Sequence, residues 1–138
     1  MPAGRLRPRS HDAFSRYRAA MSGAPDHVVV QVTTASPQEA SRIAHGAVER
    51  RLAASAQVGP LHTWYRWKGR VCEADEHLVS LFTRRERFDA LARFVNEHHG
   101  YELPQVVAIP LTEGTPAFLR WIDEGCTPVT SDAPEGED

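Results

Sequence analysis

The stretch Trp64-Tyr65-Arg66-Trp67-Lys68-Gly69-Arg70 decides the fold of this chain. It ends an extended, aromatic segment over residues 55–68; Gly69 permits a tight turn, and residues 71–82 return as a second strand. Gly59-Pro60 predicts a bulge or a sheet edge in the first strand, because proline donates no ladder hydrogen bond. The sequence therefore predicts a β-hairpin that is longer than a domain of this size can cover.

A strand and an amphipathic helix precede the hairpin. The β-branched run Val28-Val29-Val30-Gln31-Val32 predicts a central strand over residues 27–34. Ser36, Pro37 and Glu39 then form the capping box of a helix. The apolar side chains of this helix recur at three- and four-residue spacing and form one stripe, made of Ala40, Ile43, Ala44, Ala47, Val48 and Leu52.

A helix, a strand and a short helix follow the hairpin. Thr83 and Glu86 predict a second capping box, and Gly100 stands where a glycine commonly ends a helix. The apolar positions of this second helix are Phe88, Leu91, Ala92 and Val95. Residues 106–111 predict the fourth strand, and residues 115–125 a final helix that ends at Gly125.

The order β-α-β-β-α-β plus a terminal helix predicts an α+β, ferredoxin-like domain. In this arrangement an antiparallel sheet carries both main helices on one face. The opposite face is then bare and must be covered, because an exposed apolar sheet with open edges promotes aggregation. A symmetric homo-oligomer is the simplest cover.

Length and composition set further limits on the chain. Its 138 residues suit one domain, and a net charge of −2 gives no reason to expect a nucleic-acid partner. No window approaches the roughly 18 apolar residues of a membrane span. Fifteen of the sixteen basic residues are arginine, with Lys68 the one lysine, which we interpret as coding bias.

The charge distribution divides the chain into three parts. Residues 1–25 are expected to be a disordered basic extension, residues 26–126 the folded domain, and residues 127–138 a disordered acidic tail. The extension has no apolar core of a secretory signal, and it fits an organelle presequence or a nucleic-acid arm only weakly. We expect it to have no function, with Met21 as an alternative start.

The two cysteines, Cys72 and Cys126, lie far apart and form no C-x-x-C motif. This favours a reducing compartment, here the cytoplasm, and argues against a structural zinc site.

The chain resembles the CutA-type divalent-cation-tolerance family from about Val28 to Trp121. The matching residues, taken in order, are Leu52-Ala53-Ala54, Tyr65-Arg66-Trp67-Lys68-Gly69, Glu76, His98 and Tyr101-Glu102-Leu103-Pro104. The resemblance implies a tightly packed homotrimer of ferredoxin-like subunits, linked to tolerance of copper and other divalent metals, with no established enzymatic activity.

Three positions depart from the family pattern. Ser55 replaces a frequent cysteine, Gly100 a usual proline, and Phe82 a common lysine. The first change removes a soft copper ligand and the third removes a cation from the expected cleft.

His98, His99 and Glu102 are the candidate metal ligands, since imidazole and carboxylate groups suit copper or zinc. Adjacent histidines on a helix point about 100° apart, so a site needs one of them plus a residue from elsewhere, for example from a neighbouring subunit. The alternative, which we favour, is that a histidine near the helix C-terminus stabilises the terminal carbonyls.

Tyr65, Trp67, Glu76 and Tyr101 are the candidate residues of an inter-subunit ligand cleft. A buried tyrosine needs a hydrogen-bond partner, which a carboxylate supplies, and aromatic residues are enriched at interfaces. Strand alternation sends Glu73 and Asp75 to one face and Glu76 to the other, which divides this acidic cluster.

The sequence carries none of the common nucleophile, phosphate-loop, dinucleotide or zinc-protease motifs. We therefore expect a non-enzymatic homotrimer that binds copper(II), another divalent metal or a small ligand between subunits, with no cofactor needed for folding. The alternatives are a trimeric nucleotide or anion sensor and, third, a hydrolase with His98 or His99 as base.

Overall fold

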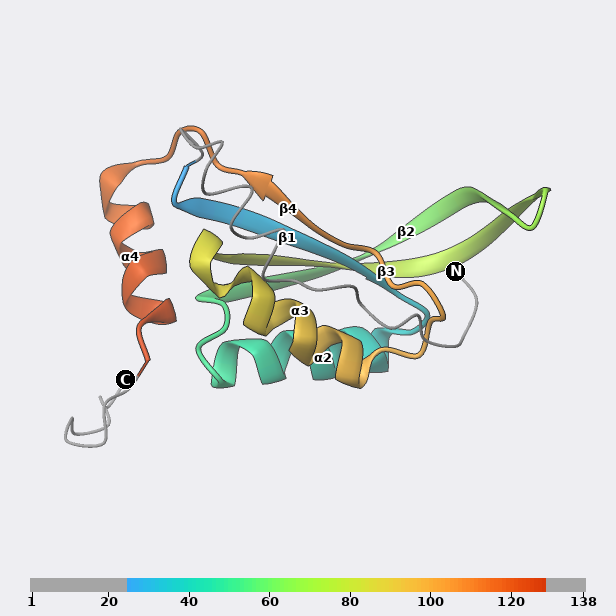
Figure 1. Ribbon diagram of the computed structural model, residues 1–138, viewed down its shortest axis with the longest axis horizontal. Coiled ribbons are helices and arrows are strands. Elements are labelled where there is room, and N and C mark those ends of the chain that lie inside the picture. Colours follow the sequence, from blue (N-terminus) through green and yellow to red (C-terminus); the bar gives the residue numbers. More distant parts are fainter. Residues whose placement is uncertain (1–24, 129–138) are drawn as a thin grey trace.

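The computed structural model describes residues 25–128, and Figure 1 shows their arrangement. The elements are β1 (His27–Thr34), α2 (Pro37–Glu49), β2 (Ser55–Trp67), β3 (Arg70–Arg84), the 3-10 helix η1 (Arg85–Arg87), α3 (Phe88–His98), β4 (Val106–Pro110) and α4 (Pro116–Cys126). The basic extension and nearly all of the acidic tail lie outside the described residues, so those domain boundaries stay predictions.

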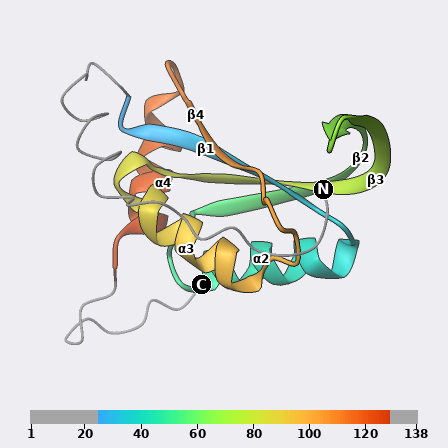
Figure 2. The same ribbon diagram turned by 45° about the vertical axis from the view of Figure 1, so that its right-hand side comes forward.

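The four strands form one antiparallel sheet in the order β2-β3-β1-β4. Helices α2 and α3 lie side by side on one face of it (Figures 1 and 2). The ferredoxin-like prediction is confirmed. Strand β2 is an edge, and its register with β3 runs without interruption from Ser55 opposite Phe82 to Trp67 opposite Arg70. Gly59-Pro60 therefore sits at an edge and causes no bulge.

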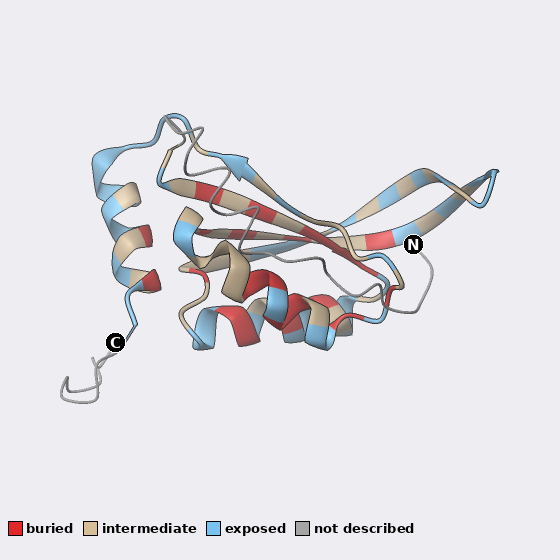
Figure 3. Ribbon diagram, in the orientation of Figure 1, coloured by how far each residue is buried: buried red, intermediate tan, exposed pale blue. Residues whose placement is uncertain are grey.

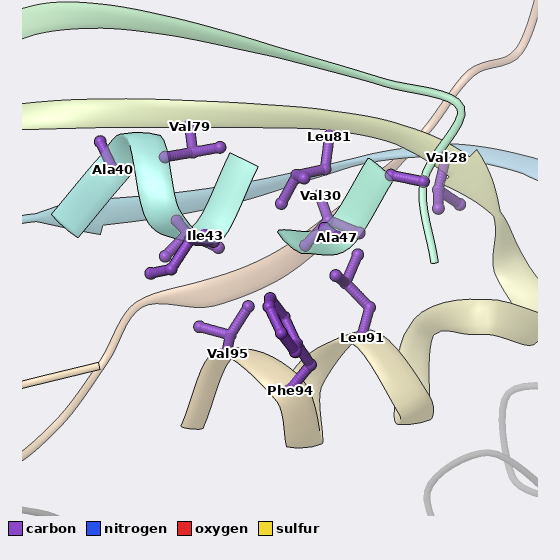
Figure 4. Close-up of a cluster of buried hydrophobic side chains, with 12 residues drawn as sticks. Val28, Val30, Ala40, Ile43, Ala47, Val79, Leu81, Leu91, Phe94 and Val95 are labelled. Carbon is purple, nitrogen blue, oxygen red and sulfur yellow. The ribbon is translucent and has the colours of Figure 1, made fainter. Parts of the chain in front are cut away.

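The hydrophobic core fills the space between this sheet and the two helices (Figure 4). It is made of alternate residues of β1 and β3, with one face each of α2 and α3: Val28, Val30, Val32, Val79, Leu81, Ala40, Ile43, Ala47, Leu91, Phe94 and Val95. Val48, predicted in the apolar stripe, is 38% exposed, because at about 100° per residue it falls at the margin of the stripe that buries Ala40 and Ala47.

Of the two predicted capping boxes, the first is formed in part and the second is absent from the described structure. At α2, Ser36 Oγ accepts the Glu39 N–H at 3.1 Å, which is one half of the predicted box; the Glu39 carboxylate accepts the Ala35 N–H instead of the Ser36 N–H. The second box is wrong: Thr83 lies inside β3, where it pairs with Val28, and its hydroxyl donates to the Leu52 carbonyl at 2.7 Å. Strand pairing with β1 thus continues past Thr83, and the chain reaches α3 through η1, without a side-chain cap.

Helix α4 packs across one end of the sheet (Figure 1). It continues one residue past Gly125, the end predicted from sequence. A Cβ on Gly125 would stand 2.6 Å from Ala54 Cβ, so this glycine permits close packing rather than terminating the helix. Arg51 and Arg87 donate hydrogen bonds to the Glu124 and Cys126 carbonyls, which satisfies the helix C-terminus with cations.

The β2–β3 hairpin extends well beyond the sheet. Strand β1 ends at Thr34, opposite His77, so residues 61–76 form a two-stranded ribbon on their own (Figures 1 and 2). Lys68 and Gly69 close it with positive φ angles of 49° and 77°, the geometry of a tight hairpin turn. Such a ribbon is marginally stable alone. Figure 3 shows that most of it is exposed or only partly buried.

Candidate functional site

A buried tyrosine–glutamate pair stands where the hairpin ribbon leaves the sheet. Glu76 of β3 is 1% exposed, and Tyr101, in the connection to β4, is 6% exposed. The Tyr101 hydroxyl donates to Glu76 Oε2 at 2.8 Å. Burial, and then this carboxylate, raise the pKa of Tyr101 well above its usual range. The phenol is therefore a permanent donor at neutral pH, and two of the predicted cleft residues are in direct contact.

His99 holds the backbone on which Tyr101 sits. Its Nε2–H donates to the Thr33 carbonyl at 2.6 Å, so Nδ1 is left to accept the Tyr101 N–H at 3.0 Å. Both ring nitrogens are thus engaged by main-chain groups, in a side chain that is 2% exposed. This arrangement fixes a neutral tautomer and leaves no lone pair of His99 for a metal while these hydrogen bonds persist.

Glu39 joins the start of α2 to the same connection. Its Oε1 accepts the Ala35 N–H at 3.3 Å, and its Oε2 accepts the Gly100 N–H at 3.2 Å. Gly100 was expected to end α3 as a capping glycine, but α3 ends at His98 and His99 is already extended. Gly100 instead allows the carboxylate to approach closely, since a Cβ there would lie 3.3 Å from Glu39 Oε2.

The other two cleft residues, Tyr65 and Trp67, lie along the ribbon towards its tip. Both are partly buried and alternate with exposed neighbours, on the face of the hairpin that carries Glu76. Trp67 is opposite Arg70, next to the turn, whereas Glu76 is opposite Leu61 at the base. The described contacts of one chain therefore join Glu76 to Tyr101 and leave Trp67 at the far end of the arm.

His98 has the geometry that suits a metal ligand best among the three predicted ligands. Its Nδ1–H donates to the Phe94 carbonyl at 2.8 Å, and its ring lies 4.4 Å from that of Phe94. This hydrogen bond holds the ring against a main-chain carbonyl of α3. It also places the proton on Nδ1, so that Nε2 keeps its lone pair, as in many metal-bound histidines.

One chain does not complete a metal site around His98. Glu102 is partly buried, and within residues 25–128 no group of three or more histidine, cysteine, aspartate or glutamate side chains is arranged to hold an ion. The set His98, His99 and Glu102 remains a prediction whose missing ligands must come from another copy or from water.

Two clusters of charged residues were not anticipated from the sequence. His62 lies between Asp75 and Glu73 on the exposed face of the ribbon. The sequence did offer a signal for the first cluster: a two-residue turn at Lys68-Gly69 sets Trp67 opposite Arg70, and counting back along both strands then places His62 opposite Asp75. At the other end of the molecule, Asp123 of α4 pairs with Arg84 and His27. A hollow of about 480 Å³ adjoins this second cluster, but its arginines, Arg84 and Arg87, are already engaged by Asp123, Glu86 and the α4 terminus.

Known proteins share this fold and sequence pattern. The family model described as CutA1 divalent ion tolerance protein matches residues 28–125. The divalent-cation tolerance protein CutA of Archaeoglobus fulgidus is 36% identical over 98 residues, which cover 71% of this chain and 96% of that protein. The divalent-cation tolerance protein CutA of Thermus thermophilus is 39% identical over 97 residues, which cover 70% of this chain and 94% of that protein. The chloroplastic protein CutA of Arabidopsis thaliana is 32% identical, and the matched segment spans about half (53%) of its length.

Solved structures agree with these matches. The periplasmic divalent cation tolerance protein CutA from Archaeoglobus fulgidus superposes with a TM-score of 0.72 at 35% identity, over 73% of this chain and 99% of that one. The Thermus thermophilus protein superposes with a TM-score of 0.72 at 37% identity, over 73% of this chain and 99% of that one. Among the described residues of the present chain, no helix has the length and apolar character required to cross a membrane.

Proposed function

Since this chain belongs to the CutA1 divalent-ion-tolerance family, we propose that it is a non-enzymatic homotrimer of divalent-metal response, with copper as its principal ion. Metal, or another small ligand, binds at clefts between subunits. The family name describes tolerance of ions and not a reaction. The free thiols Cys72 and Cys126 suit a reducing compartment, which supports a cytoplasmic location.

The observation that carries this proposal is the unsupported hairpin arm with the buried Glu76–Tyr101 pair at its base. A ribbon of this length is marginal without a packing partner. Another copy of the chain supplies that partner. Its hairpin then brings aromatic side chains such as Tyr65 and Trp67 to a neighbour, and a cleft forms from two chains where one chain provides only half.

The sheet face opposite the helices supports assembly independently. Ile109, Val29 and Phe82 are register partners across β4, β1 and β3, on the face that α2 and α3 leave open. Ile109 is 42% exposed and its strand neighbour Val107 is 44% exposed. Contiguous apolar surface of this kind commonly marks an interface, and cyclic symmetry lets three identical faces cover one another.

His98 is the metal ligand that the geometry favours, because the residue is exposed and its Nε2 keeps a lone pair. Copper(II) takes imidazole nitrogen readily and carboxylate oxygen beside it, which gives Glu102 a supporting role. His99 acts as the support that holds Thr33 and Tyr101. Because the exposed His98 and the partly buried Glu102 lie outside the hydrophobic core, we expect folding to need no metal.

Native mass spectrometry before and after limiting copper(II) tests the proposal. We expect a trimer of about 46 kDa, three times the chain mass of 15.4 kDa, that gains one copper per chain. His98→Ala should remain trimeric and lose the bound copper. His45→Ala is the matched control, since His45 is an exposed helical histidine beside Glu49 and should leave both properties intact.

Two results would contradict the proposal in distinguishable ways. A monomer would refute assembly through the hairpin. A trimer that takes up no copper, or that loses none in His98→Ala, would refute the metal site. It would favour the sensor alternative, which a thermal-shift screen with nucleotides and small anions would then examine.

A further inference from the structure

The exposed face of the hairpin arm carries a three-residue cluster outside the site described above. His62 Nδ1 lies 2.7 Å from Asp75 Oδ1, and His62 Nε2 lies 2.6 Å from Glu73 Oε1. His62 is directly opposite Asp75 in the register, and Glu73 is the next residue on that face towards the tip. One imidazole on β2 therefore spans two carboxylates on β3.

The charge state of this cluster follows from its hydrogen bonds. Ionised carboxylates only accept, and a neutral imidazole has a single N–H to donate. Both bonds can form together only when His62 is an imidazolium. Asp75 first, and then Glu73, raise the pKa of His62 above its usual value by accepting these bonds. The Trp64 ring, 4.4 Å away, packs edge-on against the imidazole.

We infer that His62, Glu73 and Asp75 form a proton-operated clamp that closes the hairpin arm. The clamp matters here because, within the described part of one chain, no third strand lies beside residues 61–76, so cross-strand side-chain pairs help to hold the ribbon in register. Loss of the proton removes one of the two bonds and leaves two carboxylates facing a neutral ring.

Among the described residues, few other charges act on His62. On the same hairpin face, Arg66 lies towards the tip and His77 towards the sheet. Helix α2 also packs on β2, but its Glu39 and Glu49 make their described contacts with main-chain N–H groups and with a histidine of α2. The two β3 carboxylates therefore dominate the proton affinity of His62.

The sign of the pH dependence follows from linkage. The closed hairpin binds the His62 proton more tightly than the open one, so the clamp is complete below the ordinary histidine pKa and weakens as pH rises through the raised value. Every tenfold difference in proton affinity between the two states is a tenfold difference in the opening equilibrium. These contacts lie within one chain, so the inference does not rest on the proposed trimer.

Hydrogen exchange of the hairpin tests the clamp in the intact protein. Protection factors for residues 60–76, corrected for intrinsic rates, are measured from about pH 5 to 8 with a chelator present, across the range in which histidine titrates. We expect protection to fall as pH rises in the natural protein and to be lower and independent of pH in His62→Gln. His45→Gln should behave as the natural protein, since His45 is exposed on α2 beside one carboxylate.

A second measurement follows the protonation of the His62 ring directly. Nitrogen NMR of the His62 ring should show both nitrogens protonated below the midpoint, and Glu73→Gln with Asp75→Asn should move that midpoint down. The inference is overturned by protection that does not change with pH, by the same pH dependence in His62→Gln, or by a His62 midpoint that the double variant leaves in place.

Discussion

Replacing Tyr101 with phenylalanine tests whether the buried pair at the base of the hairpin is an energetic centre of the fold. The substitution deletes one hydroxyl and keeps the ring beside His99. That hydroxyl is the donor to Glu76 Oε2 at 2.8 Å, in a pair with almost no exposed surface. Hydrogen bonds to charged groups contribute about 1.5–3 kcal/mol, so we expect the free energy of unfolding to fall by about 2 kcal/mol.

Urea unfolding at one fixed protein concentration measures this loss, because assembly makes stability depend on concentration. Glu76→Gln keeps an acceptor but removes its charge, so it should cost less than Tyr101→Phe. The double variant closes a mutant cycle with an expected coupling of about 1–2 kcal/mol. Tyr65→Phe is the matched control: its ring is only partly buried and we expect a change below about 0.5 kcal/mol.

The raised pKa of Tyr101 adds a pH signature with a definite sign. The folded state favours the protonated phenol, so its stabilisation is complete below the ordinary tyrosine pKa of about 10 and is lost as pH rises through the folded value. Tyr101→Phe should therefore unfold with a shallower alkaline limb. A variant as stable as the natural protein, or a coupling near zero, would refute the argument that this pair organises the site.

Two further substitutions address packing. Trp67→Ala should weaken the trimer more than the subunit fold, because Trp67 lies on the arm beyond the sheet. Native mass reports assembly and circular dichroism reports the fold of the subunit. An unchanged native mass would contradict this prediction. Gly125→Ala should destabilise by about 1–2 kcal/mol, because the new Cβ meets Ala54 Cβ at 2.6 Å and Cα at 2.9 Å, which outweighs a helix-propensity gain of about 1 kcal/mol. Gly59→Ala is its control in the same unfolding assay, because no heavy atom beyond the adjoining residues of the described chain lies within 4 Å of the added Cβ. Equal stability of the two variants would refute the packing argument.

Local patterns were sufficient to predict most of the fold. The Lys68-Gly69 turn, the cap at Ser36 and the apolar periodicities each act within a few residues, and the order of elements then admits few topologies. The errors arose where tertiary contacts replaced a local preference. Thr83 resembles a helix cap, but it pairs with β1, and its hydroxyl donates a hydrogen bond to the Leu52 carbonyl.

The site was less predictable because its contacts join residues far apart in the chain. Strand alternation correctly separated Glu76 from Glu73 and Asp75. It could not show that the connection before β4 places Tyr101 on Glu76. The adjacent histidines also differ in role because α3 ends between them: His98 stays on the helix, whereas His99 turns inward to Thr33.

The turn at Lys68 makes the arm chemically addressable. Lys68 is the single lysine of the chain, and it is exposed at the tip of the ribbon. Reagents selective for primary amines thus find one lysine side chain in this sequence. A fluorophore or a cross-linker can be placed on the end of the arm without introducing a cysteine. The natural protein therefore already carries a handle from which distances between the arms of neighbouring copies can be measured.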